Sequence, residues 1–276
     1  MKFRTLLLAS AAVLVAAPAF AGEDITAAFY TPAKGKFLSD TDVAMSRSKM
    51  DWGYGDTAKA KGWVVGEELT YGVTDNLAVF GAITNTFKPE REWKTANGTD
   101  KERYLNNDHN FAYELGVKYN MNYGKVLGQV ALAYQTYDPR SWYGTSEDYR
   151  YGKDNKWNKV INGEVKLGYA LDCGLTPYTT FAVSDDVTHS AKDKEYSWFL
   201  GAHKMLDKVS LDAGVRYEFD SDRPDTDDEW YLQAEANYFV KENVTVGVFG
   251  DYYLGGENRK DTEYDYTVGL NAKVAF

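Results

Sequence analysis

The sequence is poor in the residues that build disulfides and metal centres. Its 276 residues include one cysteine, three histidines and six prolines. Cys173 has no partner for an internal disulfide, and we expect its thiol to be shielded in a turn. No two histidines lie close enough in sequence to form a metal-binding pair, and one cysteine adds little to a zinc site. The sequence therefore predicts no disulfide, no metal site and no cofactor.

Positive charge is also scarce. The chain has 31 Lys and Arg against 41 Asp and Glu, which gives a formal net charge of −10. Nucleic-acid binding needs a basic stripe, so this balance predicts no nucleic-acid partner. The most acidic stretch, Asp220–Asp228, lacks the spacing and closing Glu of a calcium loop, and we expect it to be a solvated loop.

Long apolar runs are absent except at the N-terminus. Lys2 and Arg4 precede an apolar run from Leu6 to Ala17, and Ala19-Phe20-Ala21 follows as a small-x-small site. The run is shorter than the roughly 18–20 residues of a membrane-spanning helix. Residues 1–21 are therefore predicted to be a cleaved signal peptide, and the mature protein is expected to be exported. No cysteine follows the cleavage site, so no lipid anchor is predicted there.

Aromatic residues and a two-residue alternation are abundant. Aromatic residues make up 15% of the chain. The last stretch, from Glu263 to Phe276, alternates apolar and polar residues, which gives a strand one apolar and one polar face. Its apolar positions are Tyr264, Tyr266, Val268, Leu270, Ala272, Val274 and Phe276. Its length suits a tilted membrane-crossing strand of about 9–11 residues.

The same alternation recurs along the chain from Trp63, with Asp42–Trp52 as the weakest candidate strand. Glu67 interrupts one apolar face, and we expect a bulge or a place near the membrane edge to accommodate it. Short turns alternate with long polar segments such as Lys88–Asp108 and Asp138–Lys156. A soluble β-sandwich also alternates, but it has no need for apolar faces tipped with Tyr and Trp.

These patterns predict an all-β fold, a closed antiparallel transmembrane β-barrel of about twelve strands with short periplasmic turns and long extracellular loops. Residues 22–40 are predicted to be a periplasmic N-terminal lead-in, either outside the barrel or partly folded into its mouth. Residues 41–276 are predicted to form the barrel. The C-terminal pattern resembles the closing strand of bacterial outer-membrane barrels, and the whole mature chain resembles the porin-like superfamily of such barrels.

The resemblance implies an integral protein of the bacterial outer membrane, surrounded by lipid and lipopolysaccharide. It also implies recognition by the barrel-assembly machinery through the C-terminal strand. The residues that carry this assembly signal are Tyr266, Val268, Leu270, Ala272, Val274 and Phe276. The shared motifs are generic, so they carry no functional residues across, and the oligomeric state stays open.

The polar faces of the strands place charge in the lumen if the apolar faces meet lipid. The predicted pore-lining residues are Glu114, Lys118, Glu164, Lys166, His203, Asp212, Arg216, Glu235 and Asp251. A lumen with excess carboxylates favours a water-filled, cation-preferring channel. Alternatively, opposite charges pair and fill the lumen, because twelve strands lie between the filled eight-stranded barrels and the open 16–18-stranded ones.

The function predicted from the sequence is passive diffusion of small polar or cationic solutes, without enzymatic activity. One alternative is a closed structural or adhesive barrel that acts through its extracellular loops. Another is a barrel-embedded hydrolase that uses His203, although no His/Ser motif like that of the outer-membrane phospholipases is found. Oligosaccharide-specific porins have a similar size, but they line the lumen with basic tracks, whereas this lumen leans acidic.

Overall fold

The computed structural model describes residues 24–51, 56–95, 98–103, 109–137, 157–188, 194–220, 228–256 and 262–276. The predicted signal peptide, most of the acidic loop and all of Asp138–Lys156 lie outside the described residues. Within these ranges, no helix is long and apolar enough to cross a membrane. The described chain forms strands β1 (Phe37–Asp51), β2 (Thr57–Gly72), β3 (Leu77–Thr95), β4 (Gly98–Arg103), β5 (His109–Tyr123), β6 (Val126–Tyr137), β7 (Asn158–Tyr169), β8 (Leu175–Asp186), β9 (Lys194–Leu206), β10 (Val209–Asp220), β11 (Glu229–Lys241), β12 (Val244–Gly256) and β13 (Thr262–Ala275).

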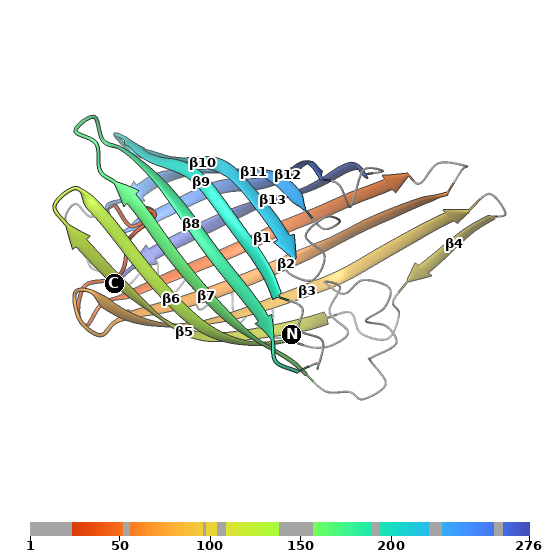
Figure 1. Cartoon of the computed structure of the whole chain (residues 1–276), viewed down its shortest axis with the longest axis horizontal. Helices are drawn as coiled ribbons and strands as arrows, with labels where there is room; N and C mark the ends of the chain where they lie inside the picture. Colours follow the sequence, from red (N-terminus) through yellow and green to blue (C-terminus); the bar gives the residue numbers. More distant parts are fainter. Residues whose placement is uncertain are drawn as a thin grey trace.

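The strands form one antiparallel sheet that closes on itself (Figure 1). β1 pairs with β2, β2 with β3 and β3 with β5, each later strand pairs with the next one, and β13 pairs with β1. Of the thirteen strands, β4 pairs only with the far end of β3, so the other twelve form the ring. The predicted closed antiparallel barrel of twelve strands is therefore confirmed.

Two strands begin earlier than predicted, and one was not predicted at all. β1 begins at Phe37 rather than Asp42, and β2 begins at Thr57 rather than Trp63. Ser39 and Thr41 occupy one face at the start of β1 and Asp40 the other, so no apolar alternation marks this part of the strand. β4 forms a short hairpin with β3 inside the segment predicted to be a polar loop.

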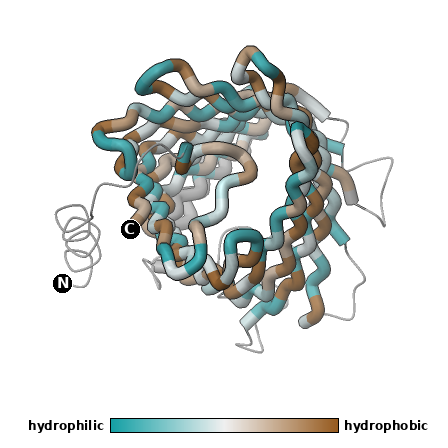
Figure 2. The backbone as a smooth tube through the Cα atoms, turned by 90° about the vertical axis from the view of Figure 1, so that its left-hand side faces the viewer, coloured by the Kyte–Doolittle hydropathy of each residue, from teal (hydrophilic) through white to brown (hydrophobic). Residues whose placement is uncertain are grey.

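Each barrel strand presents an apolar face to the outside and a polar face to the lumen. Large apolar side chains such as Leu115, Leu200 and Leu270 are exposed on the outside, the last with 64% of its surface accessible. Hydrophobic and hydrophilic positions alternate along the strands (Figure 2). Burial of the outer face therefore requires lipid or protein around the barrel, as in outer-membrane barrels.

Glu67 lies on the outer face without a bulge at its position. Its register with β1 and β3 is continuous, and the irregularity of β2 lies between Lys61 and Trp63 instead. The hydroxyl of Ser39 donates to Oε1 of Glu67 at 2.6 Å, and the Thr41 hydroxyl donates to Oε2. The predicted bulge is thus wrong, and two hydroxyls of the neighbouring strand hold the carboxylate instead; the alternative, a place near the membrane edge, stays a prediction.

The seam of the barrel joins β1 to β13. Beside the paired strands, the backbone N–H of Phe37 donates to the carbonyl of Phe276 at 2.7 Å, and that of Phe276 donates back at 2.9 Å. The two phenyl rings stack with centroids 5.5 Å apart. The register with β1 places the predicted assembly-signal residues on the outer face of β13.

Candidate functional site

The lumen contains a segment of the chain itself. Residues Asp24–Lys36, which we call the lumen bar, lie inside the ring of strands when the barrel is viewed along its length (Figure 2). The bar has turns but no strand or helix. Its side chains of Ile25 and Phe29 are only 4% and 7% exposed, so its apolar residues are packed against the barrel wall.

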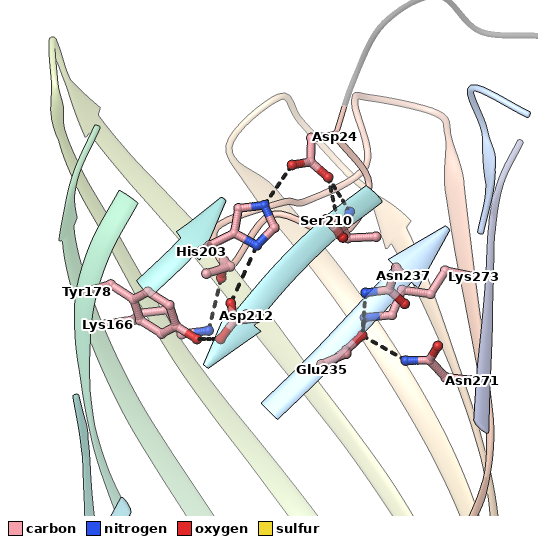
Figure 3. Close-up of polar contacts among 12 residues, drawn as sticks. Asp24, Lys166, Tyr178, His203, Ser210, Asp212, Glu235, Asn237, Asn271 and Lys273 are labelled. Carbon is pink, nitrogen blue, oxygen red and sulfur yellow. Dashed lines mark hydrogen bonds and ion pairs between the residues drawn. The ribbon is translucent and has the colours of Figure 1, made fainter. Parts of the chain in front are cut away.

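The first end of the bar is held by a histidine on β9. Nε2 of His203 lies 2.7 Å from Oδ2 of Asp24, and Nδ1 lies 3.5 Å from Oδ2 of Asp212 on β10 (Figure 3). The second distance is too long for a good hydrogen bond but within ion-pair range. The hydroxyl of Tyr178 donates to the other oxygen of Asp212 at 2.8 Å. His203 therefore bridges a carboxylate of the bar and a carboxylate of the wall.

Asp24, at the first end of the bar, carries a titratable carboxyl and lies outside the strands. Burial raises the pKa of its carboxyl, but hydrogen bonds with His203 and Thr26 outweigh burial and hold the pKa below its ordinary value of 3.8. The Thr26 hydroxyl is also 2.7 Å from Oγ of Ser210 on β10. Ile25 packs beside them in a cluster with Phe239 and Ala275.

The middle of the bar is held by polar side chains of β5 and β7. Nδ2 of Asn120 donates to the carbonyl of Phe29 and to Oγ1 of Thr31, both at 2.8 Å. Nε2 of Gln129 donates to Oδ1 of Asn120 at 2.8 Å and so fixes the orientation of its amide. Nζ of Lys166 donates to the carbonyl of Ala28 at 3.0 Å. Unpaired backbone groups of a loop inside a barrel would be costly, and these side chains satisfy them.

A second polar cluster lies on the wall formed by β11, β13 and β1. Nζ of Lys273 lies 3.0 Å from Oε1 of Glu235 and 3.5 Å from Oδ2 of Asp40. The side-chain amides of Asn237 and Asn271 donate to the same oxygen of Glu235, at 2.8 and 2.7 Å (Figure 3). One cation is thus shared by two carboxylates, which leaves this wall acidic.

Further pairs cover the rest of the lumen wall. Nζ of Lys118 on β5 lies 2.7 Å from Oε1 of Glu68 on β2 and 4.4 Å from the centroid of the Phe80 ring. Nearer the long loops, Nε of Arg216 lies 3.0 Å from Oε1 of Glu218, and its guanidinium lies 4.8 Å from the centroid of the Tyr231 ring. Basic side chains in the lumen are therefore held by acidic or aromatic neighbours.

Comparison with known proteins agrees with this architecture. No protein-family model matches the chain. Outer membrane porin C of Salmonella typhimurium is 30% identical over 210 residues, which are 76% of this chain and 47% of that protein. The chain thus spans about half the length of this curated relative.

Two solved structures share the fold. An outer-membrane channel of Pseudomonas putida F1 superposes with a TM-score of 0.62 at 13% identity, over 92% of this chain and all of that one. The NanC porin superposes with a TM-score of 0.51 at 10% identity, over 85% of this chain and 98% of that one. The chain therefore shares the fold of these two proteins and is similar in sequence to an outer-membrane porin over part of that porin's length.

The nine residues predicted to line the pore all lie on the lumen face of this porin-like barrel, and most of them are held in pairs. Lys118 pairs with Glu68, Lys166 lies 3.6 Å from Glu164, and Glu235 pairs with Lys273. His203 lies beside Asp212, and Arg216 pairs with Glu218. Glu114 pairs in register with Ala82 and Gln135, and Asp251 with Gln233 and Thr267. That they line a conducting pore stays a prediction.

Sequence reasoning missed the residues that belong to the lumen bar or hold it, namely Asp24, Thr26, Phe29, Asn120, Tyr178 and Ser210. One signal was available. The bar contains the apolar run Ile25-Thr26-Ala27-Ala28-Phe29-Tyr30, which no strand uses and which an exposed periplasmic lead-in would leave in water.

The hydrolase alternative finds no support in the geometry around His203. A nucleophile activated by histidine must lie within hydrogen-bond reach of a ring nitrogen. Both ring nitrogens of His203 face carboxylates, and the nearby hydroxyl of Ser210 is bonded to Thr26. Among the residues that the structure describes, no group of three or more metal-ligating side chains is found either.

Cys173 lies in the tight turn between β7 and β8, where Gly174 adopts a φ of 77°. The side chain is exposed. The expectation of a shielded thiol is therefore wrong, because a turn this short presents its middle residues to solvent.

Proposed function

We propose that this porin-like barrel is a passive channel for small polar or cationic solutes. The observation that carries the proposal is the charge of the lumen face. Its inward carboxylates include Asp40, Asp42, Glu68, Glu114, Glu164, Asp212, Glu218, Glu235 and Asp251, whereas its amino and guanidinium groups include Lys118, Lys166, Arg216 and Lys273.

An excess of fixed negative charge in a narrow, low-dielectric passage raises the local concentration of cations. Each ammonium or guanidinium lies against a carboxylate, which cancels the charge of both groups, and the remaining carboxylates leave the lumen with an excess of negative charge. Uncharged polar solutes would pass by diffusion, and anions would meet a repulsive potential. The names of the related porin and channel support the same class of function.

The test is single-channel recording of the protein in a planar bilayer with a salt gradient across it. We expect steady openings with a cation-selective reversal potential. Glu114→Gln combined with Glu164→Gln should shift that potential towards zero, because both carboxylates face the lumen. Asp172→Asn is the matched control, because it removes a carboxylate from the exposed turn between β7 and β8.

The rival function is a closed barrel that acts through its long loops. The lumen bar favours it, since residues Asp24–Lys36 occupy space that an open pore would need. A folded barrel that never conducts, but binds a surface through Lys88–Asp108 or Asp138–Lys156, would replace the channel proposal with this one. Under either function, we propose that the signal peptide directs export of the chain and that the assembly machinery recognises its C-terminal strand.

A further inference from the structure

We propose that the lumen bar, Asp24–Lys36, forms the constriction of the channel at the end of the barrel that carries the short turns. The inference rests on the proposed channel function and names the part of the chain that limits the flow. It differs from the sequence-based prediction, in which wall side chains alone define the narrow part of the pore.

The contacts of the bar show that it runs inside the lumen along several strands of the wall. Asp24 and Thr26 are held by β9 and β10, whereas Phe29 and Thr31 are held by β5. In the ring, β6 to β9 separate β5 from β10 on one side, and β11, β12, β13, β1, β2 and β3 separate them on the other. On the shorter side, Lys166 and Gly168 on β7 and Tyr178 on β8 contact the stretch between these anchors, so the bar follows the inside of the wall from β10 to β5 and occupies lumen space there.

Beyond β5, the bar reaches β2. The N–H of Gly35 donates to the carbonyl of Gly72 at 2.7 Å, and the N–H of Gly72 donates to the carbonyl of Lys36 at 2.9 Å. The N–H of Lys34 reaches Oδ1 of Asp75 in the turn between β2 and β3 at 3.3 Å. Short turns lie at this end of the barrel, so the bar spans the lumen near them.

The wall is shaped to receive the bar. A Cβ at Gly168 on β7 would lie 2.6 Å from the ring of Phe29, and a Cβ at Gly72 would lie 2.2–2.3 Å from the carbonyls of Ala33 and Pro32. Any larger residue at these two positions would push the bar away. Tyr178 adds an edge-on ring contact with Phe29, with centroids 5.9 Å apart.

Several wall side chains predicted to meet solute instead hold the bar. Lys166 donates to a carbonyl of the bar, and His203 contacts its first carboxylate. Solutes are therefore confined to the space that the bar leaves free, and its release would widen that space. The wall cluster around Glu235 and Lys273 would then become the next narrow part of the path.

The experiment uses the full chain, extracted from the outer membrane of a bacterial host, in a Cys173→Ser background. Thr26→Cys and Ser210→Cys replace two hydroxyl oxygens that are 2.7 Å apart, so the new thiols can form a disulfide between bar and wall. Asp24→Ala and Phe29→Ala in the same chain remove other attachments of the bar. One protein then has a locked, oxidised state and a released, reduced state.

We expect low conductance in the oxidised state and a severalfold rise after reduction, with larger polyethylene glycols entering the reduced pore. Gel mobility with and without reductant verifies the disulfide, and heat-dependent mobility verifies that the barrel is folded. Lys125→Ala is the control substitution, because this exposed side chain lies in the turn between β5 and β6 and outside the bar, and it should leave the conductance of the wild type unchanged.

If the disulfide does not form, the triple variant Asp24→Ala, Thr26→Ala and Phe29→Ala carries the test, with an expected rise over the wild type. Equal conductance and equal polymer cut-off in the locked and released states would overturn the role of the bar while leaving the channel intact. A folded barrel that is silent in both states would overturn the channel function itself. A silent locked state with a conducting released state would support the proposal.

Discussion

Nε2 of His203 lies 2.7 Å from Oδ2 of Asp24, although 179 positions of the sequence separate the two residues. The contact ties β9 to a segment that belongs to no strand. The same imidazole faces Asp212 on its other side, so its position is fixed from both directions. His203 therefore anchors the first end of the lumen bar to the barrel wall.

Acid is expected to loosen this anchor. Burial raises the pKa of Asp24, but hydrogen bonds with His203 and Thr26 bring the pKa below 3.8. Because the docked carboxyl has the lower pKa, docking is fully favoured above about pH 4 and weakens as the pH falls through the lowered value. Single-channel conductance should therefore be steady from neutral to weakly acidic pH and rise at lower pH.

Asp24→Asn provides the control for this acid effect. It should conduct more than the wild type at neutral pH and should lack the acid-dependent rise. The other polar groups of the lumen are unchanged in this variant, so any pH response that it keeps measures their contribution. A wild type whose conductance follows that of Asp24→Asn at every pH would contradict the prediction.

The shared lysine of the wall cluster should matter for stability. Lys273→Met leaves Asp40 without its cation and Glu235 with only the amide donors, so we expect a loss of about 3 kcal/mol in the free energy of unfolding. Urea unfolding in lipid vesicles measures it. Lys125→Met breaks the exposed Lys125–Asp172 pair and should cause no measurable change, since exposed ion pairs contribute little. Equal effects of the two substitutions would refute the role of burial.

Gly269 should not tolerate a side chain. A Cβ at this position would lie 2.4 Å from the ring of Phe249 and 2.8 Å from the carbonyl of Val43. We expect Gly269→Ala to cost about 1–3 kcal/mol, the usual range for overpacking. Phe249→Leu in the same chain should recover part of the loss. Gly81→Ala is the control, because the nearest atom to its Cβ is 3.8 Å away.

The exposed thiol of Cys173 reports on the orientation of the barrel. The short turns are expected to face the periplasm, so a membrane-impermeant maleimide should label Cys173 only after the outer membrane is permeabilised. Ser146→Cys, in the predicted loop Asp138–Lys156 and in a Cys173→Ser background, should be labelled in intact cells. The reverse pattern would mean that the barrel is inserted in the opposite direction.

The sequence was sufficient where local alternation decides the structure. Strands such as β5 and β10 were predicted because one face is uniformly apolar, as lipid requires. It failed at the start of β1, where Ser39 and Thr41 face outwards to hold Glu67, and this need arises only once β2 lies alongside.

The lumen site could be predicted only in part. The alternation within β7 and β9 predicts that Lys166 and His203 face the lumen. Their contacts with Ala28 and Asp24 depend on closure of the ring, which brings distant parts of the chain together. No local pattern encodes such a contact. The alternation within each strand shows only that these side chains face the lumen, so they were predicted to contact solute.

The seam between β1 and β13 has a consequence for how the molecule forms. Its two strands come from opposite ends of the barrel sequence, so both edges stay unpaired until the whole sheet has assembled. Open edges invite pairing with other chains. The bar precedes β1 directly and has partners on β5, β7, β9 and β10, so it must enter the lumen before the seam shuts or be threaded in afterwards from one end. Closure of the sheet and capture of the bar are therefore coupled events.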